Sequence, residues 1–311
     1  MTETIEILMA TYNGEAFLRE QMDSILCQTD GGWHLTVSDD CSEDGTGEIL
    51  REYEEAYPGK IRRISAGKRF GNARDQFFFL SGQCPANWRM FCDQDDTWEK
   101  EKVAKFRRAM EEAEASYGAE TPLLVFCDQT PADEHLTPLA PSLMRYQKQY
   151  SNSFDYRSIL MQNVVTGGAM AVNRPLSQLA LEGAGKDTKG RILMHDWWMA
   201  AAAARFGRIV YLDEPLGTYR QHGENAVGAK HVGSAEYRRD RLGKLEEVRE
   251  AIRRKKEQAA CFREVYRDKL TGEDVLFLEG FEKEKSGIGF YLKYGGLIHG
   301  AERKIGFALL G

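Results

Sequence analysis

Short apolar runs alternate with amphipathic stretches through the first 130 residues of the chain. The apolar runs predict five strands, at residues 5–9, 34–38, 61–65, 88–92 and 123–127. The amphipathic stretches predict helices at residues 16–27, 46–56, 72–80 and 100–115. This alternation is typical of a mainly parallel sheet, in which right-handed crossovers place the carboxyl ends of the strands along one edge. Ligands of such α/β proteins bind at that edge, so the residues after each strand are the first candidates for a site.

The pattern changes twice after residue 130. Residues 166–174 predict a strand and a turn, and residues 197–206 predict a helix that ends at Gly207. Residues 237–270 carry twelve Lys or Arg against seven Asp or Glu. We therefore expect one unit at residues 1–230, with halves at 1–130 and 131–230, and a helical C-terminal region at 231–311. An apolar stripe of that region should pack on the first unit or on another subunit, and it comprises Leu242, Leu245, Val248, Ile252, Ala259, Phe262 and Tyr266.

The segment after the fourth predicted strand carries three carboxylates in four residues. Asp93, Asp95 and Asp96 stand in the sequence FCDQDDTW, at residues 91–98. Carboxylates this close raise one another's pKa, so a site that keeps them usually supplies a cation to share. Because these oxygens have no Cys or His between them, Mg²⁺ or Mn²⁺ fits better than zinc. The alternative is a solvated acidic turn that caps the next helix.

Two more polar clusters follow predicted strands at the same edge. Residues 10–15 (ATYNGE) lack the GxGxxG pattern of dinucleotide-binding folds and offer an aromatic ring on which a flat base could stack. Residues 38–46 (SDDCSEDGT) contain a turn and a helix start, and leave Asp39 and Asp40 able to accept from a pyrimidine N3–H. A turn without further function is the alternative for each cluster. A base pocket beside a cation site predicts a nucleoside diphosphate as the ligand.

Composition narrows the classes of protein that fit. The 311 residues are 42% hydrophobic and 29% charged, with a net charge of −6, so no global basic field attracts nucleic acid. The six cysteines are scattered without a CxxC pair, which predicts reduced, buried thiols. No basic and apolar leader precedes the first predicted strand, and no run of about 18 apolar residues is present. We expect a cytoplasmic protein.

The ordered set of motifs resembles a known family. The set comprises ATYNGE, SDDCSEDGT, FCDQDDTW, TGGAMAVNR (166–174), MHDWW (194–198) and YRQHGENAVG (219–228). These segments are similar to inverting, nucleotide-sugar-dependent glycosyltransferases of the GT-A fold, in glycosyltransferase family 2. More narrowly, they resemble bacterial rhamnosyltransferases that use dTDP-L-rhamnose to build cell-wall or surface polysaccharides. The resemblance implies an α/β fold with a mixed, mainly parallel sheet, a nucleotide-sugar-binding half at 1–130 and an acceptor half at 131–230.

The resemblance assigns the donor site to the first half. Tyr12 would stack on the pyrimidine, and Asp40 would accept from its N3–H. Asp93 would contact the ribose or support the metal through water, while Asp95 would coordinate a Mg²⁺ or Mn²⁺ ion that bridges the diphosphate. Arg74 would add a cationic contact to the donor, with a solvated arginine at a helix start as an equal alternative. The other implied donor contacts are Thr11, Asn13 and Glu15.

The MHDWW segment supplies the base that inversion requires. Asp196 would take the proton of the acceptor hydroxyl, and capping of the following helix is the alternative. A helix N-terminus would lower the pKa of Asp196, whereas burial beside tryptophans would raise it. His195 stands where the family often has Glu, which leaves its role open. Trp197 and Trp198 are core residues or an acceptor platform, and Gly167 would allow close approach of the backbone to a sugar.

The motif at residues 219–228 and the C-terminal residues 290–310 predict contacts with metal, nucleotide and membrane. In related enzymes a histidine at the position of His222 completes the metal shell or touches the diphosphate, and packing is the alternative for a lone histidine. The glycine-containing segment 223–228 predicts a loop that orders over bound nucleotide. Aromatic and basic residues at 290–294 and 304–310 suit a bilayer interface. We therefore expect a saccharide or lipid-linked acceptor and peripheral contact with the inner face of the cell membrane, while a homo-oligomer stays open.

Three other functions remain open. A UDP-linked hexose fits the same donor site. A nucleotidyltransferase would need a Gly-rich loop and a triphosphate-binding Lys or Arg after the first strand, which the ATYNGE segment lacks. A non-catalytic protein that binds sugar nucleotides would keep the donor edge without using Asp196 as a base.

Overall fold

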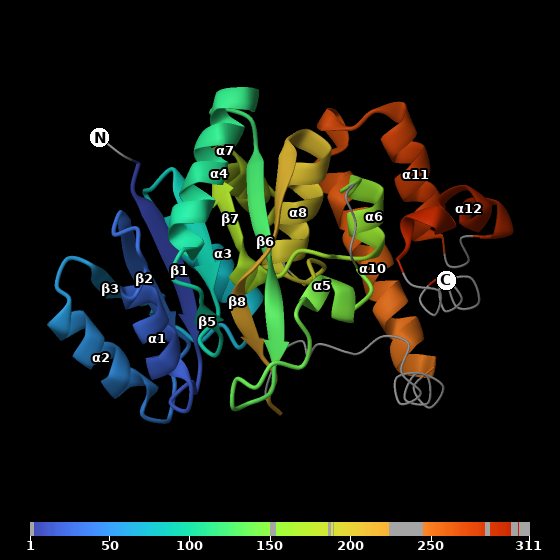
Figure 1. Ribbon diagram of the computed structural model, residues 1–311. Coiled ribbons are helices and arrows are strands. Elements are labelled where there is room, and N and C mark those ends of the chain that lie inside the picture. The colour runs from blue at the N-terminus through green and yellow to red at the C-terminus, as the bar shows by residue number, and fades with distance from the viewer. Residues whose placement is uncertain are drawn as a thin grey trace.

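The computed structural model describes residues 3–149, 154–185, 188, 190–223, 245–283, 287–299 and 304. Within them, one eight-stranded mixed sheet runs in the order β3–β2–β1–β4–β7–β6–β8–β5 (Figure 1). The strands are β1 (Ile5–Thr11), β2 (Trp33–Asp39), β3 (Ile61–Ile64), β4 (Trp88–Cys92), β5 (Thr97–Trp98), β6 (Leu123–Ala132), β7 (Met170–Asn173) and β8 (Arg208–Arg220). β1 is parallel to β2 and β4, and β2 is parallel to β3, which confirms the parallel half predicted from the sequence.

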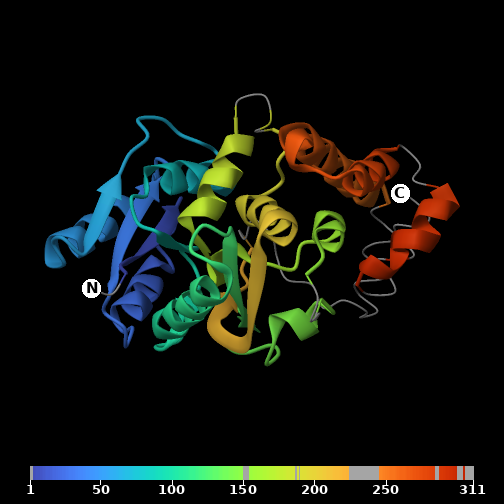
Figure 2. The same ribbon diagram turned by 90° about the horizontal axis from the view of Figure 1, so that it is seen from above.

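Helices cover both faces of the sheet and continue beside it at the C-terminal end (Figure 2). They are α1 (Leu18–Leu26), α2 (Thr46–Ala56), α3 (Ala73–Gln83), α4 (Lys102–Tyr117), α5 (Leu143–Tyr146), α6 (Tyr156–Met161), α7 (Arg174–Gly183), α8 (His195–Phe206), α10 (Leu245–Val265), α11 (Gly272–Glu282) and α12 (Gly287–Tyr294). Short 3₁₀ turns are η1 (Gly167–Ala169), η2 (Arg267–Lys269) and η3 (Gly295–Leu297). The five strands and four helices predicted in the first 130 residues are all present.

The central strands divide their side chains between two hydrophobic cores, because successive residues of a strand point to opposite faces of a sheet. In β1, Ile7 and Met9 enter the core formed with α1, α2 and α4, whereas Leu8 and Ala10 enter the core formed with α3, α7 and α8. Strands that are buried on both faces read as continuous apolar runs. This is why the sequence reveals them clearly.

The second half of the sheet has an order that the sequence did not predict. β7 is the strand expected within residues 166–174, but it lies between β4 and β6 and is antiparallel to both. β8 runs parallel to β6, and the two-residue β5 pairs antiparallel with β8. The acidic segment therefore connects two strands, and α4 begins only at Lys102, with no side-chain cap. The alternative of an acidic turn that caps the next helix is wrong.

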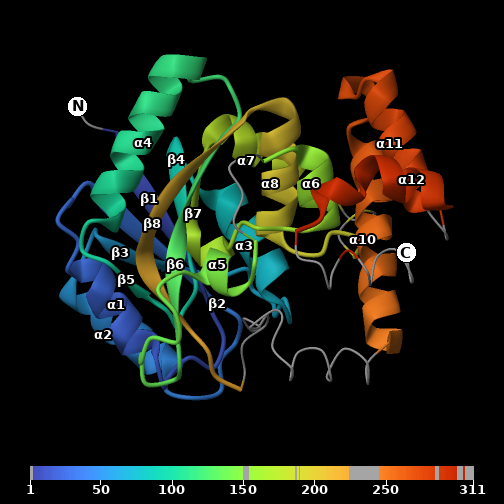
Figure 3. The ribbon, with the colours of Figure 1, turned by 45° about the vertical axis from the view of Figure 1, so that its right-hand side comes forward.

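The C-terminal helices α10, α11 and α12 pack on α6 and α8, away from β3 and α2 (Figures 1 and 3). One cluster of buried residues contains Trp198 of α8 together with Phe262 of α10 and Phe277 of α11. This confirms the packing of the predicted stripe on the first unit, since Ile252, Ala259, Phe262 and Tyr266 are all buried. Leu242 and the side chain of Leu245 lie outside the described residues.

A buried carboxylate joins α11 to the helices of the preceding half. Asp274 Oδ1 accepts from the hydroxyl of Tyr156 in α6 at 2.7 Å, and Asp274 Oδ2 accepts from Arg205 Nε in α8 at 2.8 Å. Burial alone would raise the pKa of Asp274, but the hydrogen bonds from Arg205, Tyr156 and Thr271 hold it below its usual range. The expected boundary at residue 230 lies outside the described residues, so the division into 1–230 and 231–311 stays a prediction.

The aromatic residues expected at a bilayer interface are engaged in the fold where they are described. Phe290 packs on Phe277 and Phe281, with ring centroids 5.7 and 6.0 Å away, and Tyr294 packs on Phe277 at 5.0 Å. Leu292 remains 77% exposed, and residues 305–310 lie outside the described part. Within the described residues, no helix combines the length and apolar character needed to cross a bilayer. The rings of Phe290 and Tyr294 are used in packing within the protein, whereas the side chain of Leu292 is exposed and could contact a membrane.

The cysteines agree only partly with the expectation of buried thiols. All six are free, and Cys84, Cys92, Cys127 and Cys261 are buried. Cys27 and Cys41 are exposed instead, because each follows the end of a helix or strand at the surface.

Candidate active site

The candidate site lies at the carboxyl ends of β1, β2 and β4, as the strand order predicts. The backbone of Tyr12 and the side-chain amide of Gln94 exchange two hydrogen bonds: Tyr12 N–H donates to Oε1 at 2.8 Å, and Nε2 donates to the Tyr12 carbonyl at 2.9 Å. A Cβ atom on Gly14 would collide with this amide, which explains the glycine. The acidic segment is thus held in a defined position beside the end of β1.

Several predicted donor contacts bond to a neighbouring loop. Asn13 Oδ1 and Glu15 Oε2 each accept, at 2.9 Å, from a backbone N–H within residues 42–45. Asn13 has a positive φ of 47°, which this residue type tolerates better than most. Thr11 Oγ1 donates to Asp39 Oδ1 at 2.9 Å. These bonds join the loops after β1 and β2, and the donor-binding roles of Thr11, Asn13 and Glu15 stay predictions.

Asp40 anchors a third loop. It is 3% exposed, and its two carboxylate oxygens accept from the backbone N–H groups of Phe70 at 2.5 Å and Gly71 at 2.7 Å. The same loop carries Arg69, whose guanidinium carbon lies 4.5 Å from the ring centroid of Tyr12. Tyr12 is 38% exposed, so its ring is accessible at the edge where a base would stack. Sequence reasoning did not identify Arg69.

Asp95 and His222 meet, although 127 positions separate them in the chain. Asp95 Oδ2 lies 2.8 Å from Nε2 of His222, and both side chains are largely buried. Phe17 packs against the imidazole, with ring centroids 4.7 Å apart. The structure therefore brings together the two residues that the resemblance implied as metal ligands. The loop predicted after His222 lies outside the described residues from position 224.

Asp96 and Arg220 form a buried connection that sequence reasoning missed. Asp96 is 1% exposed and accepts from Gln129 Nε2 and from the backbone N–H of Arg220, both at 3.1 Å. The guanidinium of Arg220 donates from Nε to the Asp95 carbonyl at 2.7 Å and pairs with Glu20. The end of β8 is thereby tied to the acidic segment two residues before His222. The signal in the sequence was the presence of three carboxylates within residues 93–96.

Asp93 is partly buried and lies against η1. Nζ of Lys102 donates to the Gly168 carbonyl at 2.7 Å, and the backbone of Gly168 acts to lower the pKa of Asp93. A Cβ atom on Gly168 would lie 2.8 Å from Asp93 Oδ2 and 3.2 Å from Asp96 Oδ2. Burial, followed by the charges of Asp95 and Asp196, raises the pKa of Asp93 to about 7. Burial and the same crowding raise that of Asp96 well above its usual value.

Asp196 lies inside the first turn of α8 and does not cap it. The N-cap is Met194, which makes no side-chain cap, and Asp196 Oδ1 accepts from the N–H of Trp197 at 2.6 Å. The backbone N–H of Gly167 and the side chain of Asn163 also favour the ionised form of this carboxylate and so act to lower its pKa. Burial nevertheless dominates and raises its pKa to about 7. The capping alternative is therefore wrong, and burial outweighs the helix N-terminus in setting the pKa.

His195 is a buried neutral side chain. Its imidazole packs between Phe77 and Phe91, with ring centroids 4.2 and 5.1 Å away, and burial lowers its pKa to about 3. Within the described residues neither ring nitrogen has a hydrogen-bond partner. A Cβ atom on Gly167 would lie 3.0 Å from Cε1 of this ring. His195 thus fills the space that a side chain at position 167 would need, and an acceptor contact by Gly167 stays a prediction.

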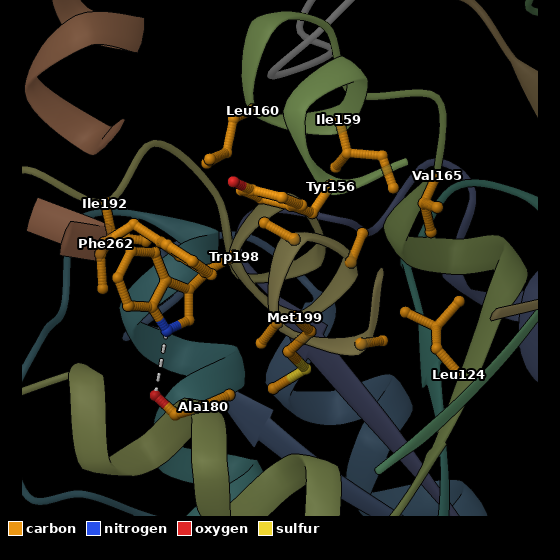
Figure 4. Packing of buried hydrophobic residues seen from close by; sticks show 14 of the residues in the cluster. Leu124, Tyr156, Ile159, Leu160, Val165, Ala180, Ile192, Trp198, Met199 and Phe262 are labelled. Carbon is orange, nitrogen blue, oxygen red and sulfur yellow. Dashed lines mark hydrogen bonds between the residues drawn. The ribbon is translucent and has the colours of Figure 1, made fainter. Parts of the chain in front are cut away.

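Trp198 belongs to the core. It has no exposed surface, and its indole lies against Gly183 and Phe262, with Nε1 donating to the Ala180 carbonyl at 3.2 Å (Figure 4). An acceptor cannot reach this ring, so its assignment as an acceptor platform is wrong. Trp197 is partly buried, donates from Nε1 to the Ile159 carbonyl at 2.5 Å and faces Lys255 of α10. Its predicted acceptor contact stays a prediction.

Arg74 links the start of α3 to the segment before α8. Its Nε donates to Asp75 Oδ1 at 2.9 Å, and its Nη1 donates to the Ile192 carbonyl at 2.6 Å. The side chain is only 14% exposed, so the alternative of a solvated arginine is wrong. A donor contact by Arg74 stays a prediction and requires that these bonds loosen.

The residues present fit a divalent cation only with help from a ligand. Within the described ranges, no three His, Cys, Asp or Glu side chains are arranged to hold a metal ion by themselves. Asp95 offers a carboxylate oxygen and His222 an imidazole nitrogen at the same point. Mg²⁺ and Mn²⁺ are commonly held by one or two side chains together with phosphate oxygens and water. Asp95 and His222 would therefore hold the ion together with a bound diphosphate.

The sequence of this chain is similar to those of known glycosyltransferases. The family model described as "Glycosyl transferase family 2" matches residues 6–172. The chain is 29% identical to the dTDP-rhamnosyl transferase RfbG of Shigella flexneri over 242 residues, which cover 74% of this chain and 77% of the relative. It is 27% identical to the putative teichuronic acid biosynthesis glycosyltransferase TuaG of Bacillus subtilis over 149 residues, 48% of this chain and 58% of the relative.

A solved structure shows the same fold. The mannosyltransferase PcManGT from Pyrobaculum calidifontis, in complex with GDP-Man and Mn²⁺, superposes with a TM-score of 0.54 at 14% identity. The match covers 99% of this chain and 87% of that one. The sheet order and the flanking helices described above are thus those of a GT-A glycosyltransferase. Because the family match extends over more than half of the 311 residues, the chain belongs to glycosyl transferase family 2 and is a glycosyltransferase.

Proposed function

We propose that this enzyme transfers L-rhamnose from dTDP-L-rhamnose, with inversion, to a saccharide acceptor in cell-wall or surface polysaccharide synthesis. The donor is supported by the similarity to the rhamnosyl transferase of S. flexneri. The pathway is supported by the family resemblance and by the similarity to the putative teichuronic acid enzyme. An acceptor linked to a membrane lipid, a homo-oligomer and a place at the inner face of the cell membrane belong to the same proposal.

The observation that carries the proposal is the position of η1 between two carboxylates. A Cβ atom on Gly168 would lie 2.8 Å from Asp93 Oδ2, and a Cβ atom on Gly167, one residue earlier, would lie 3.8 Å from the Cβ of Asp196. Asp93 and Asp95 belong to the loop after β4, whereas Asp196 lies in the first turn of α8. A group for the donor and a group for the acceptor thus flank one short turn. This is the arrangement that direct transfer between two bound substrates requires.

In this mechanism the protein's own groups bind, orient and accept a proton. Tyr12 stacks on the base and the Asp95–His222 pair faces the diphosphate, where a bound Mg²⁺ or Mn²⁺ would offset the charge of the leaving group. Asp196 accepts the proton of the acceptor hydroxyl as that oxygen attacks the anomeric carbon and the bond to the diphosphate breaks. A pKa of about 7 suits this role, because the carboxylate is ionised in a large fraction of molecules at neutral pH yet is basic enough to accept the proton.

The donor is tested with a panel of dTDP-L-rhamnose, UDP-glucose, UDP-GlcNAc and GDP-mannose, each with MnCl₂. We expect selective thermal stabilisation by dTDP-L-rhamnose and release of dTDP in the presence of acceptor. Selective stabilisation by a UDP-hexose would replace the donor and keep the transferase. Equal response to all four, without release of nucleotide, would contradict the proposal.

A further inference from the structure

One peptide group in the segment that leads into α8 is held from both sides. Residues 192–194 have no regular secondary structure. Arg74 Nη1 donates to the Ile192 carbonyl at 2.6 Å, and Gln258 Oε1 accepts from the Leu193 N–H at 2.8 Å. These two backbone groups belong to the same planar peptide unit. Its orientation is therefore fixed by α3 on one side and by α10 on the other.

The clamped peptide stands directly before the turn that carries Asp196. α8 begins at His195, and its N-cap Met194 makes no side-chain cap. Without a capping side chain, the position of the first turn depends on the segment that leads into it. Asp196 lies in this turn beside Gly167 of η1. A reorientation of the clamped peptide would therefore move the Asp196 carboxylate relative to η1.

Gln258 is a costly residue for its surroundings unless its hydrogen bond is needed. The side chain has no exposed surface, and within the described part of the chain its Nε2 has no hydrogen-bond partner. An amide that is buried with unpaired N–H groups lowers stability, and an apolar side chain of similar volume would avoid that loss. Such residues are expected where the geometry of a site matters more than the stability of the fold.

Two further contacts join α10 to the same part of the chain. Arg191, just before the clamped peptide, forms a bidentate pair with Glu264, with N–O distances of 2.5 and 3.1 Å. Nζ of Lys255 lies 5.5 Å from the ring centroid of Trp197, the residue after Asp196. α10 thus contacts residues on both sides of Asp196.

We propose that Gln258 of the C-terminal region is a positioning residue for the proton-accepting carboxylate of Asp196. With Arg74 on the opposite side, it holds the peptide of residues 192 and 193 in the orientation that places the first turn of α8 against η1. The family match ends at residue 172, so this support comes from a part of the chain that the family model does not cover. The inference rests on the proposed function in that Asp196 is the base of the transfer.

Initial rates of the full chain test this role with two substitutions of Gln258. Gln258→Met removes the acceptor oxygen and keeps a similar volume, and it should lower kcat by about 10- to 100-fold with the KM for the donor nearly unchanged. Gln258→Glu keeps an oxygen that can accept from Leu193 N–H, so it should retain most of the rate. Equal losses in both variants would overturn the proposal, as would an unchanged rate in Gln258→Met when Asp196→Asn is inactive.

Lys256 offers a matched control in the same helix. This lysine is also buried, at 7% exposure, and its Nζ donates to a backbone carbonyl of another segment, that of Lys283, at 2.6 Å. Lys256→Met should lower the Tm but keep kcat near the wild-type value at temperatures where the variant is folded. Equal losses of kcat in Lys256→Met and Gln258→Met would show a general effect of α10 stability and contradict a specific role for Gln258.

Hydrogen exchange separates this inference from the proposed function, because it requires no substrate. Peptides covering residues 191–198 should exchange faster in Gln258→Met than in the wild-type protein, and no faster in Lys256→Met. Unchanged exchange in Gln258→Met would overturn the positioning role, and so would failure of this variant to fold, which would show a structural role. Faster exchange together with full transfer by Asp196→Asn would keep the positioning role and contradict the proposed base instead.

Discussion

The strand-end loops, residues 11–15, 39–46 and 93–96, and the region around α8 hold their functional groups in different ways. In the loops after β1 and β2, side chains bond to backbone N–H groups of neighbouring loops, as Asp40 does with Phe70 and Gly71. Around α8, packing dominates, and Asp196 is enclosed beside His195, Gly167 and the helices behind them. The first kind of support fixes the loops that carry the proposed donor groups relative to one another. The second kind changes the chemistry of the group that it encloses.

The two regions use aspartate for two different proposed roles, as a metal ligand and as a base. Asp95 stands beside His222 and keeps 15% of its side chain exposed, which suits a group that shares a cation with a ligand. Burial raises the pKa of Asp196 to about 7, which suits a group that accepts a proton. The environment, more than the side chain, divides the two roles.

Replacing the carboxylate of Asp196 tests the difference most severely. Asp196→Asn should lower the transfer rate by roughly 10²–10⁴-fold and leave donor binding nearly unchanged, because only the proton acceptor is lost. In the wild-type enzyme, kcat/KM should rise with pH through about 7 and level off above it, since the ionised carboxylate is the active form. The exposed Asp268→Asn is the matched control. Unchanged transfer in Asp196→Asn would reduce this residue to a structural one.

The two neighbouring tryptophans test the packing of the α8 region. Trp198→Ala should lower the free energy of unfolding by about 3–5 kcal/mol, because it leaves a cavity between α7, α8 and α10. Trp197→Ala should lower it less and should raise the KM for the acceptor. Denaturant unfolding and initial rates with varied acceptor measure the two effects. If Trp197→Ala lost as much stability as Trp198→Ala and left the KM for the acceptor unchanged, Trp197 would not belong to the acceptor site.

The connection made by Arg220 tests the strand-end loops. Arg220→Met should raise the Mn²⁺ concentration needed for half-maximal activity by about 10–100-fold, because Asp95 and the end of β8 lose their common support. Arg19→Met removes an exposed ion pair with Glu52 and should change stability by about 1 kcal/mol or less. A metal response that is identical in both variants would mean that Arg220 does not position Asp95.

The smallest expected effect concerns the turn between the regions. Gly168→Ala places a methyl group against Asp93 and Asp96 and should destabilise the fold by about 1–3 kcal/mol. Gly47→Ala in α2 has open space around the new methyl group and should be neutral or slightly stabilising. Thermal unfolding compares the two, and an equally harmless Gly168→Ala would mean that the turn adapts to the added group.

Particular residues show how far the sequence alone could lead. Asp95 and Asp196 were identifiable because each stands in a motif at the end of a strand or the start of a helix. Arg220 and Lys102 were not, because an isolated basic residue in a strand or helix carries no local sign of what it will bond. Trp198 stayed open between the core and the acceptor site, because two adjacent tryptophans give no local sign of which one is buried.

The sequence by itself determined the alternation of strands and helices, the parallel first half of the sheet and the polar clusters at its edge, because these depend on contacts within short segments. The tertiary structure alone decided that β7 enters between β4 and β6, that Asp95 meets His222, and that burial raises the pKa of Asp196. These features depend on which distant segments pack together, and the free energy of a buried charge is set by those neighbours rather than by its place in the chain.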